Sequence, residues 1–299
     1  MCCLAMTVNQ DSKSYHLPEG YNTLVFTDMQ DFPVNDIRQP FRRLLYPLNG
    51  QKRKILERSE SMKQMIREII RQRQTDPKVY DDPLNLLLSA RYEDTGEAMT
   101  EEQLISEVLV LLLAGHDTTA NTLAWLLYLV AAHKEVQQRL ISAVEKMTDP
   151  QDCIKNDYFQ AVINESMRLY PPAWVADREA LTADRYGQFS YPAGTVVITF
   201  FYGLHRSSDH WTDAGSFKPD RFLDEHGKIK KMNAYYPFGA GPRMCIGNNF
   251  AMAEMCFFLR AFFSRFAISS TGQVPGLKPL LTLRPDKVVL NLPKIGSLG

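Results

Sequence analysis

The sequence predicts a mainly α-helical fold with small β-sheets. Long segments place apolar residues at helical spacing, and these segments begin or end at capping residues or prolines. Segments rich in strand-forming residues are fewer, and each is only a few residues long. The chain has 299 residues, which is enough to bury a substantial hydrophobic core in one domain or two.

The helices follow one another along most of the chain. Thr100 and Gln103 form a capping box at the start of the longest one, and Pro171 ends another. The longest helix is long and largely apolar, so we expect it to be buried in the middle of a helical domain. Residues 1–50 lack this periodicity and are expected to form short helices and loops. The expected helices are 51–74, 83–90, 100–132, 134–147, 156–170 and 248–266.

Short strands are expected in two places. Residues 188–191 and 195–200 flank the turn Pro192-Ala193-Gly194, which predicts a hairpin in which these two strands pair. Near the C-terminus, residues 280–283 and 287–292 are strand-like, and we expect them to pair antiparallel.

The composition narrows the class of protein. Hydrophobic residues make up 45% and charged residues 23%, as in an ordinary globular protein. The formal net charge is zero, whereas nucleic-acid-binding proteins normally carry a basic excess, so no nucleic-acid partner is expected. The five cysteines form no Cys-x-x-Cys pair, which favours a reducing compartment. Because no signal peptide or membrane span is evident, we expect this chain to be cytoplasmic; an anchor in a preceding segment stays open.

A glycine-rich stretch, residues 237–247, presents one cysteine at the start of the last predicted helix. Gly239 and Gly247 have no Cβ, so the backbone can turn tightly and approach a flat ligand. The helix N-terminus adds positive potential beside Cys245, which favours the thiolate. Such a thiolate could serve as an axial ligand of a haem iron. Arg243 could pair with a carboxylate of the bound molecule. On Cys245 alone, a buried structural cysteine would be the better interpretation.

Two further stretches carry polar residues in apolar helices. Gly115, Asp117 and Thr118 interrupt the apolar sequence of the longest helix near its centre. Glycine and threonine are poor helix formers, and residues that disfavour the surrounding structure often have a functional role. The alternative for Thr118 is a hydrogen bond back to a helix carbonyl, which is common. Glu165 and Arg168 lie on one face of a later helix, and an isolated pair of this kind is usually a weak surface ion pair.

Taken together, these motifs resemble the cytochrome P450 family. The pattern Phe238-Gly239-x-Gly241-x-Arg243-x-Cys245-x-Gly247 resembles its haem-binding loop. The stretch around Asp117-Thr118 is similar to its oxygen-activation motif. Glu165 and Arg168 in a Glu-x-x-Arg helix and Arg221 in a Pro-x-Arg-Phe segment resemble the three residues of its structural ion-pair triad. His205-Arg206 and Trp211 also match the family, whereas Ser208, Ala214 and Asp220 depart from its commoner residues.

The resemblance implies a fold and a set of site residues. The fold would be the cytochrome P450 fold, with residues 1–299 forming the C-terminal two-thirds of a single haem-thiolate catalytic domain whose N-terminal part is missing. Asp117 would relay protons, and Thr118 would donate a hydrogen bond to the activated oxygen. Glu165, Arg168 and Arg221 would form the structural triad. The haem b, ligated through its iron by the Cys245 thiolate, would further be bound by Arg243, Arg178, Phe238, Gly239, Gly247 and Gly115.

The implied activity is that of a monooxygenase. Such an enzyme inserts one oxygen atom of O2 into a small apolar organic substrate, and a ferredoxin or flavoprotein reductase supplies the electrons. Two alternatives stay open. One is a haem-thiolate isomerase, dehydratase or peroxygenase, although such relatives often lack the acid–threonine pair. The other is a truncated relative that binds no haem.

Overall fold

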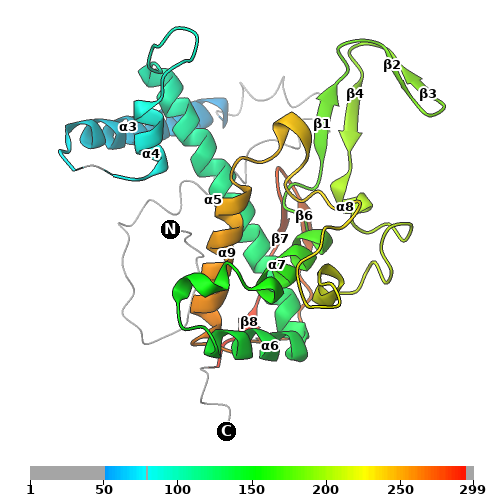
Figure 1. Ribbon diagram of the computed structural model, residues 1–299. Coiled ribbons are helices and arrows are strands. Elements are labelled where there is room, and N and C mark those ends of the chain that lie inside the picture. The colour runs from blue at the N-terminus through cyan, green and yellow to red at the C-terminus, as the bar shows by residue number, and fades with distance from the viewer. Residues whose placement is uncertain (1–50, 79, 294–299) are drawn as a thin grey trace. The chain divides into compact units, whose positions relative to one another are not determined.

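The computed structural model describes residues 51–78 and 80–293 (Figure 1). The chain divides into two compact units, 1–116 and 117–299. The boundary between the units falls inside helix α5, Glu101–Ala132. The short helices and loops expected in residues 1–50 lie outside the described residues.

In the first unit, two helices pack against the start of α5. These are α3, Gln51–Thr75, and α4, Pro83–Ser89, which confirms both expected helices. The core of this unit consists of buried side chains from α3 and α5: Ile66, Ile70, Leu104 and Ile105. The capping box also forms, since the Thr100 amide donates to Gln103 Oε1 at 2.9 Å and the Gln103 amide donates to Thr100 Oγ1 at 3.3 Å.

Burial along α5 is less uniform than its composition predicts. In the second unit Leu123, Trp125 and Leu126 are at most 1% exposed. In the first unit, where α3 and α4 cover a single face of α5, Val110 and Leu112 are 59% and 45% exposed. Apolarity alone therefore did not show which part of the helix is covered.

The remaining helices belong to the second unit. Its α-helices after α5 are α6, Lys134–Glu145; α7, Asp157–Leu169; α8, Phe201–Leu204; and α9, Asn248–Phe263. α6, α7 and α9 confirm the expected helices 134–147, 156–170 and 248–266 within a few residues, whereas the short α8 was not expected. Three 3₁₀ helices lie between these α-helices: η2, Pro150–Cys153; η3, Pro219–Phe222; and η4, Gly241–Arg243. The segment from residue 201 to residue 247 is mostly loop. Trp211 and Phe222 of this segment pack against Ala161 of α7.

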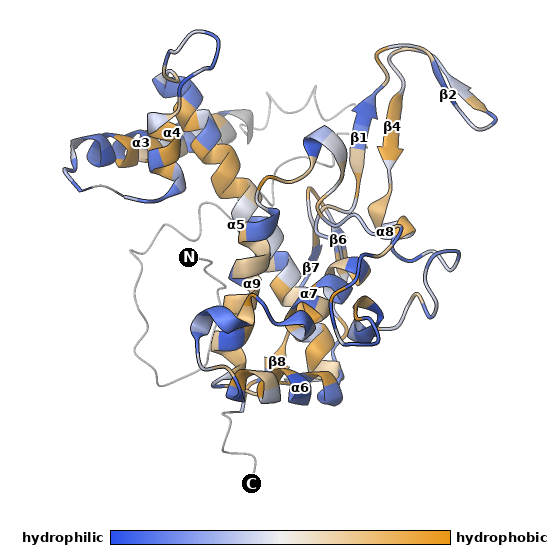
Figure 2. Ribbon diagram, in the orientation of Figure 1, coloured by the Kyte–Doolittle hydropathy of each residue, from blue (hydrophilic) through white to orange (hydrophobic). Residues whose placement is uncertain are grey.

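The strands form two-stranded antiparallel sheets, and the predicted pairings are wrong. In the first two sheets, β1 (Ala176–Glu179) pairs with β4 (Val196–Thr199), and β2 (Asp184–Tyr186) pairs with β3 (Phe189–Tyr191). The expected hairpin strands are thus neighbours in sequence but pair with other partners. Figure 2 shows β1 as hydrophilic beside a hydrophobic β4.

The C-terminal strands also pair differently. β6 (Leu277–Pro279) pairs with β7 (Leu283–Pro285), and β5 (Ser269–Ser270) pairs with β8 (Leu290–Asn291). Most of the expected strand 280–283 is instead the turn between β6 and β7. Strands of two to four residues carry too little pattern to specify a partner. No helix in the described ranges is long and apolar enough to cross a membrane.

Candidate functional site

The glycine-rich stretch folds as a tight loop that ends at the first turn of α9. Gly239 and Gly241 have φ angles of 73° and 72°, in the left-handed region that side chains with a Cβ rarely adopt. The Cys245 amide donates to the Phe238 carbonyl at 2.9 Å, which closes the loop. A Cβ placed on Gly247 would lie 3.9 Å from the Cys245 sulfur. The loop therefore holds the thiol in a defined place just before the helix.

The thiol of Cys245 is accessible, and its neighbours are apolar. Cys245 is exposed, and the adjacent Met244 and Ile246 are 52% and 93% exposed. Cys153 and Cys256, the other cysteines in the described ranges, are both buried. Burial raises the pKa of the Cys256 thiol to about 12, with a smaller contribution from Cys153. Among these cysteines, only Cys245 can serve as a ligand.

These features fit a haem. Its flat apolar face suits the exposed apolar side chains beside the sulfur, and its iron accepts a single axial thiolate. Arg243 in η4 and Arg178 in β1 are both exposed. In ranges 51–78 and 80–293 neither forms an ion pair, so both guanidinium groups are available to an anionic ligand. Arg178 Nη1 donates only to the Asp177 carbonyl, at 2.6 Å.

The interrupted stretch of α5 stays helical, and its polar residues find partners. A Cβ on Gly115 would meet nothing within 4 Å, so the space beside this residue is open. The Asp117 carboxylate accepts a hydrogen bond from the Thr282 hydroxyl. The Thr118 carbonyl accepts from the hydroxyl of Thr122, at 2.9 Å. The expected acid–threonine pair thus lies on adjacent positions of one helix, with the acid tied to the β6–β7 turn.

A second contact fixes the same turn against α5. Trp125 Nε1 donates to the Leu283 carbonyl at 3.2 Å, and the Leu283 amide donates to the Pro172 carbonyl at 2.9 Å. The Trp125 ring stacks on Tyr170, with centroids 3.8 Å apart and planes 4° from parallel. The β6–β7 turn is therefore held at both α5 and the end of α7.

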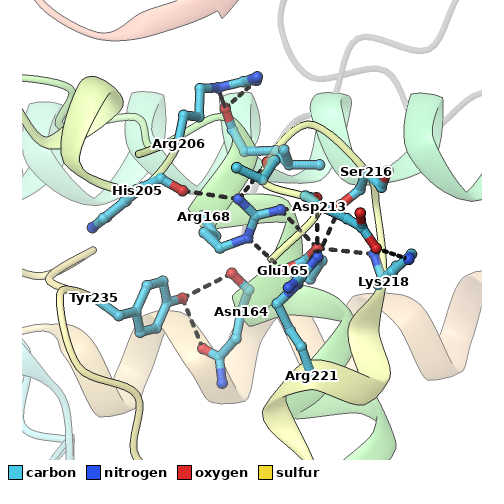
Figure 3. Close-up of polar contacts among 12 residues, drawn as sticks. Asn164, Glu165, Arg168, His205, Arg206, Asp213, Ser216, Lys218, Arg221 and Tyr235 are labelled. Atoms are coloured by element: carbon cyan, nitrogen blue, oxygen red, sulfur yellow. Dashed lines mark hydrogen bonds and ion pairs between the residues drawn. The ribbon is translucent and has the colours of Figure 1, made fainter. Parts of the chain in front are cut away.

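The structure brings Glu165, Arg168 and Arg221 together in one buried ion network (Figure 3). Glu165 and Arg168 make a bidentate pair, with Nε–Oε2 at 2.7 Å and Nη2–Oε1 at 2.9 Å, and both side chains are fully buried. Arg221 Nε donates to Glu165 Oε1, also at 2.9 Å. This is not the weak surface pair that i, i+3 spacing usually gives, because the surrounding loop excludes water from it.

His205 connects this network to the cysteine loop. Arg168 Nη1 donates to the His205 carbonyl at 2.8 Å, and the Tyr236 amide donates to His205 Nε2 at 2.9 Å. The pKa of His205 is lowered to about 4, mainly by burial and to a smaller extent by the nearby Arg168 charge. The imidazole is therefore neutral at physiological pH and can accept this bond. Tyr236 directly precedes the glycine-rich loop, so the contact sets where that loop begins.

The predicted site residues thus fall into local groups, and the contacts between groups were not predictable from the motifs. The cysteine loop, the acid–threonine pair and the ion network each form as local units. In the sequence, His205 matches the family's pattern, but the match predicts no function for this residue. Asn121 and Thr282 were missed: Asn121 follows Asp117 by one helical turn, which is a usable signal. Thr282 lies 165 residues from its partner, and no local pattern indicates such a contact.

Comparison with known proteins places the chain in a family. The family described as Cytochrome P450 matches residues 1–294. Cyclooctat-9-en-7-ol 5-monooxygenase of Streptomyces melanosporofaciens is 33% identical, over 72% of this chain and 47% of that protein. Pentalenene oxygenase of Streptomyces avermitilis is 29% identical, over 76% of this chain and 51% of that protein. The crystal structure of the cytochrome P450DA heme domain matches with a TM-score of 0.77 at 27% identity, over 83% of this chain and 56% of that one.

The chain therefore belongs to the cytochrome P450 family, and its fold is the α+β fold of P450 heme domains. It spans about half the length of the curated relatives it matches.

Proposed function

We propose that this chain is the catalytic part of a haem-thiolate monooxygenase. The observation that carries the proposal is the exposed Cys245 thiol, held by a closed glycine loop at a helix start and flanked by apolar side chains. Membership of the P450 family supports the same assignment. Both compact units would then belong to one haem-binding domain.

Cys245 would ligate the iron of haem b as a thiolate, and the haem, when bound, supplies the oxidation chemistry. Phe238, Gly239 and Gly247 would shape the loop against the haem face. Arg243 and Arg178 would pair with the haem carboxylates, as their exposed guanidinium groups allow. For Gly115, the missing Cβ would leave room beside α5, a role that rests on the family resemblance.

Asp117 and Thr118 would handle protons on α5. The Asp117 carboxylate takes a proton from solvent and passes it on, since a carboxyl group can both accept and donate. The Thr118 hydroxyl would direct that proton, since a hydroxyl both accepts and donates a hydrogen bond. Glu165, Arg168 and Arg221 would position the cysteine loop through His205 and would take no part in the chemistry.

The proposed substrate is a small apolar organic molecule, oxidised with O2. Two of the relatives are named for acting on organic molecules of this kind, cyclooctat-9-en-7-ol and pentalenene. Electrons would come from a separate ferredoxin or flavoprotein reductase.

The test is the spectrum of the reduced carbon monoxide complex of the natural full-length protein. We expect the red-shifted band that gives the family its name, and we expect Cys245→Ala to abolish it. Cys256→Ala is the matched control, because it removes a buried thiol and should leave the band in place. If Cys245→Ala keeps the band, this cysteine is not the ligand.

Two other outcomes would redirect the proposal. Full-length protein that folds but takes up no haem would show a relative without haem chemistry. Turnover that is driven by peroxide and needs no reductase would favour the peroxygenase alternative.

A further inference from the structure

A buried hydrogen-bonded chain leads to the Asp117 carboxylate. The Thr282 hydroxyl donates to Asp117 Oδ2, and Asn121 Nδ2 donates to Thr282 Oγ1 at 3.0 Å. Thr282 and Asn121 are only 7% and 9% exposed. Neither residue belongs to the motifs that define the proposed site.

The direction of this chain follows from its chemistry. An ionised carboxylate accepts hydrogen bonds and cannot donate them, so the proton between Thr282 and Asp117 belongs to the hydroxyl. The hydroxyl has a single proton, and Asn121 must therefore present its amide nitrogen rather than its oxygen. Because Asn121 donates to the Thr282 hydroxyl, that hydroxyl directs its own proton at Asp117, which is the only acceptor for it among these three side chains.

The hydroxyl cannot easily move away from the carboxylate. Thr282 lies in the β6–β7 turn, and the next residue, Leu283, is bonded through its carbonyl to Trp125 and through its amide to Pro172. Asp117, Asn121 and Trp125 follow one another at four-residue spacing on α5, so one face of the helix carries all three contacts with the turn.

We propose that Thr282 is a positioning residue for proton delivery, held in its donating orientation by Asn121. It holds Oδ2 of Asp117 and leaves Oδ1 to take up and release the proton. This inference rests on the proposed role of Asp117 as the proton relay. Without the hydroxyl the carboxylate can rotate, and protons then reach the reacting oxygen less selectively.

The decisive variant is Thr282→Val, which keeps the branched shape and removes the hydroxyl. In the natural full-length protein, supplied with its reductase, we expect a several-fold larger share of reductant to end as hydrogen peroxide. Haem content and the carbon monoxide band should stay unchanged. Thr282→Ser, which keeps the hydroxyl, should couple like the parent. Thr271→Val makes the same chemical change at an exposed threonine that bonds the Val289 carbonyl, and it should also behave like the parent.

A second readout needs no turnover. Thr282→Val should lower the melting temperature by roughly 2–6 °C, because a hydrogen bond to a carboxylate is lost. The same change in an Asp117→Ala background should cost clearly less. Additive shifts would show that the two side chains do not interact in solution.

The outcomes separate this inference from the proposed function. If Asp117→Asn slows turnover while Thr282→Val couples like the parent, the positioning role is overturned and the proposed function stands. If the parent shows no thiolate band, the proposed function fails and this inference fails with it. If Thr282→Val loses haem, Asn121→Leu carries the test, and parent-like coupling of that variant would overturn the inference.

Discussion

Replacing Arg168 by alanine should destabilise the protein more than any surface ion-pair mutation. The guanidinium donates to both oxygens of Glu165 and to the carbonyls of His205, Ala214 and Ser216. Its removal leaves the His205 and Ala214 carbonyls without this donor, whereas the Ser216 carbonyl keeps a long bond from Arg221 Nη2 at 3.4 Å. Glu165 keeps only Arg221 and the Lys218 amide as partners.

The size of the effect follows from this burial. Removing one partner of a buried pair costs about 3–5 kcal/mol, because the other charge stays buried and is poorly compensated. A domain has about 5–15 kcal/mol of stability in total. At roughly 2–4 °C per kcal/mol for domains of this size range, the melting temperature should fall by roughly 6–20 °C.

Thermal unfolding followed by circular dichroism, together with haem content, measures the loss. Arg139→Ala is the matched control: Arg139 and Asp220 also form an ion pair, at 2.8 Å, but their side chains are 48% and 63% exposed. That pair should contribute about 1 kcal/mol or less. Arg168→Lys should be intermediate, because an ammonium keeps the charge and loses the planar fork. An Arg168→Ala variant that melts within the range of the control and holds a full complement of haem would refute the reasoning.

Two further predictions concern α5 and His205. Thr118→Ala should raise the hydrogen peroxide released per reductant consumed without changing haem content. Thr119 lies about 100° further round the helix, so Thr119→Ala should leave the peroxide yield at the parent value. The opposite result would shift the proposed motif by one residue. For His205, the folded pKa of about 4 lies below the ordinary value of about 6.5. Between these two pH values the unfolded state binds more protons than the folded state. The free energy of unfolding should therefore decrease as the pH falls from about 6.5 to about 4. The loss should approach about 3 kcal/mol, and urea midpoints at pH 5 and pH 7 should converge in His205→Gln; equal pH dependence in parent and variant would show that another group titrates.

Much of this architecture could be predicted where the signal is local. Helices such as α5 and α7 are specified by apolar periodicity and by caps a few residues apart, and the structure confirms them. The cysteine loop is specified by glycines close to Cys245. The pairing of β1 with β4 could not be predicted, because it depends on competition between short strands that are not adjacent in sequence.

The same distinction applies to the site. Arg168 and Glu165 are recognisable at their spacing, but their burial depends on a loop that lies 37–56 residues further along. Thr282 is an ordinary threonine in a short apolar run, and only the fold brings it to Asp117. Sequence patterns therefore identified the residues of each local unit, and the fold was needed to show how the units are connected.

Arg168 donates hydrogen bonds to three main-chain oxygens of the segment after α8, those of His205, Ala214 and Ser216. Its guanidinium carbon also lies 5.0 Å from the centroid of the buried Trp211 ring. Arg221 likewise donates to the Thr212 and Asp213 carbonyls. Main-chain oxygens are common to all amino acids, so these hydrogen bonds do not constrain the side chains of the residues that supply them, whereas burial constrains Trp211 and Phe217. The length of the segment is constrained instead. Deleting a single residue would shift every following carbonyl out of register with both guanidinium groups. This stretch should therefore tolerate substitution at its exposed positions and almost no change in length.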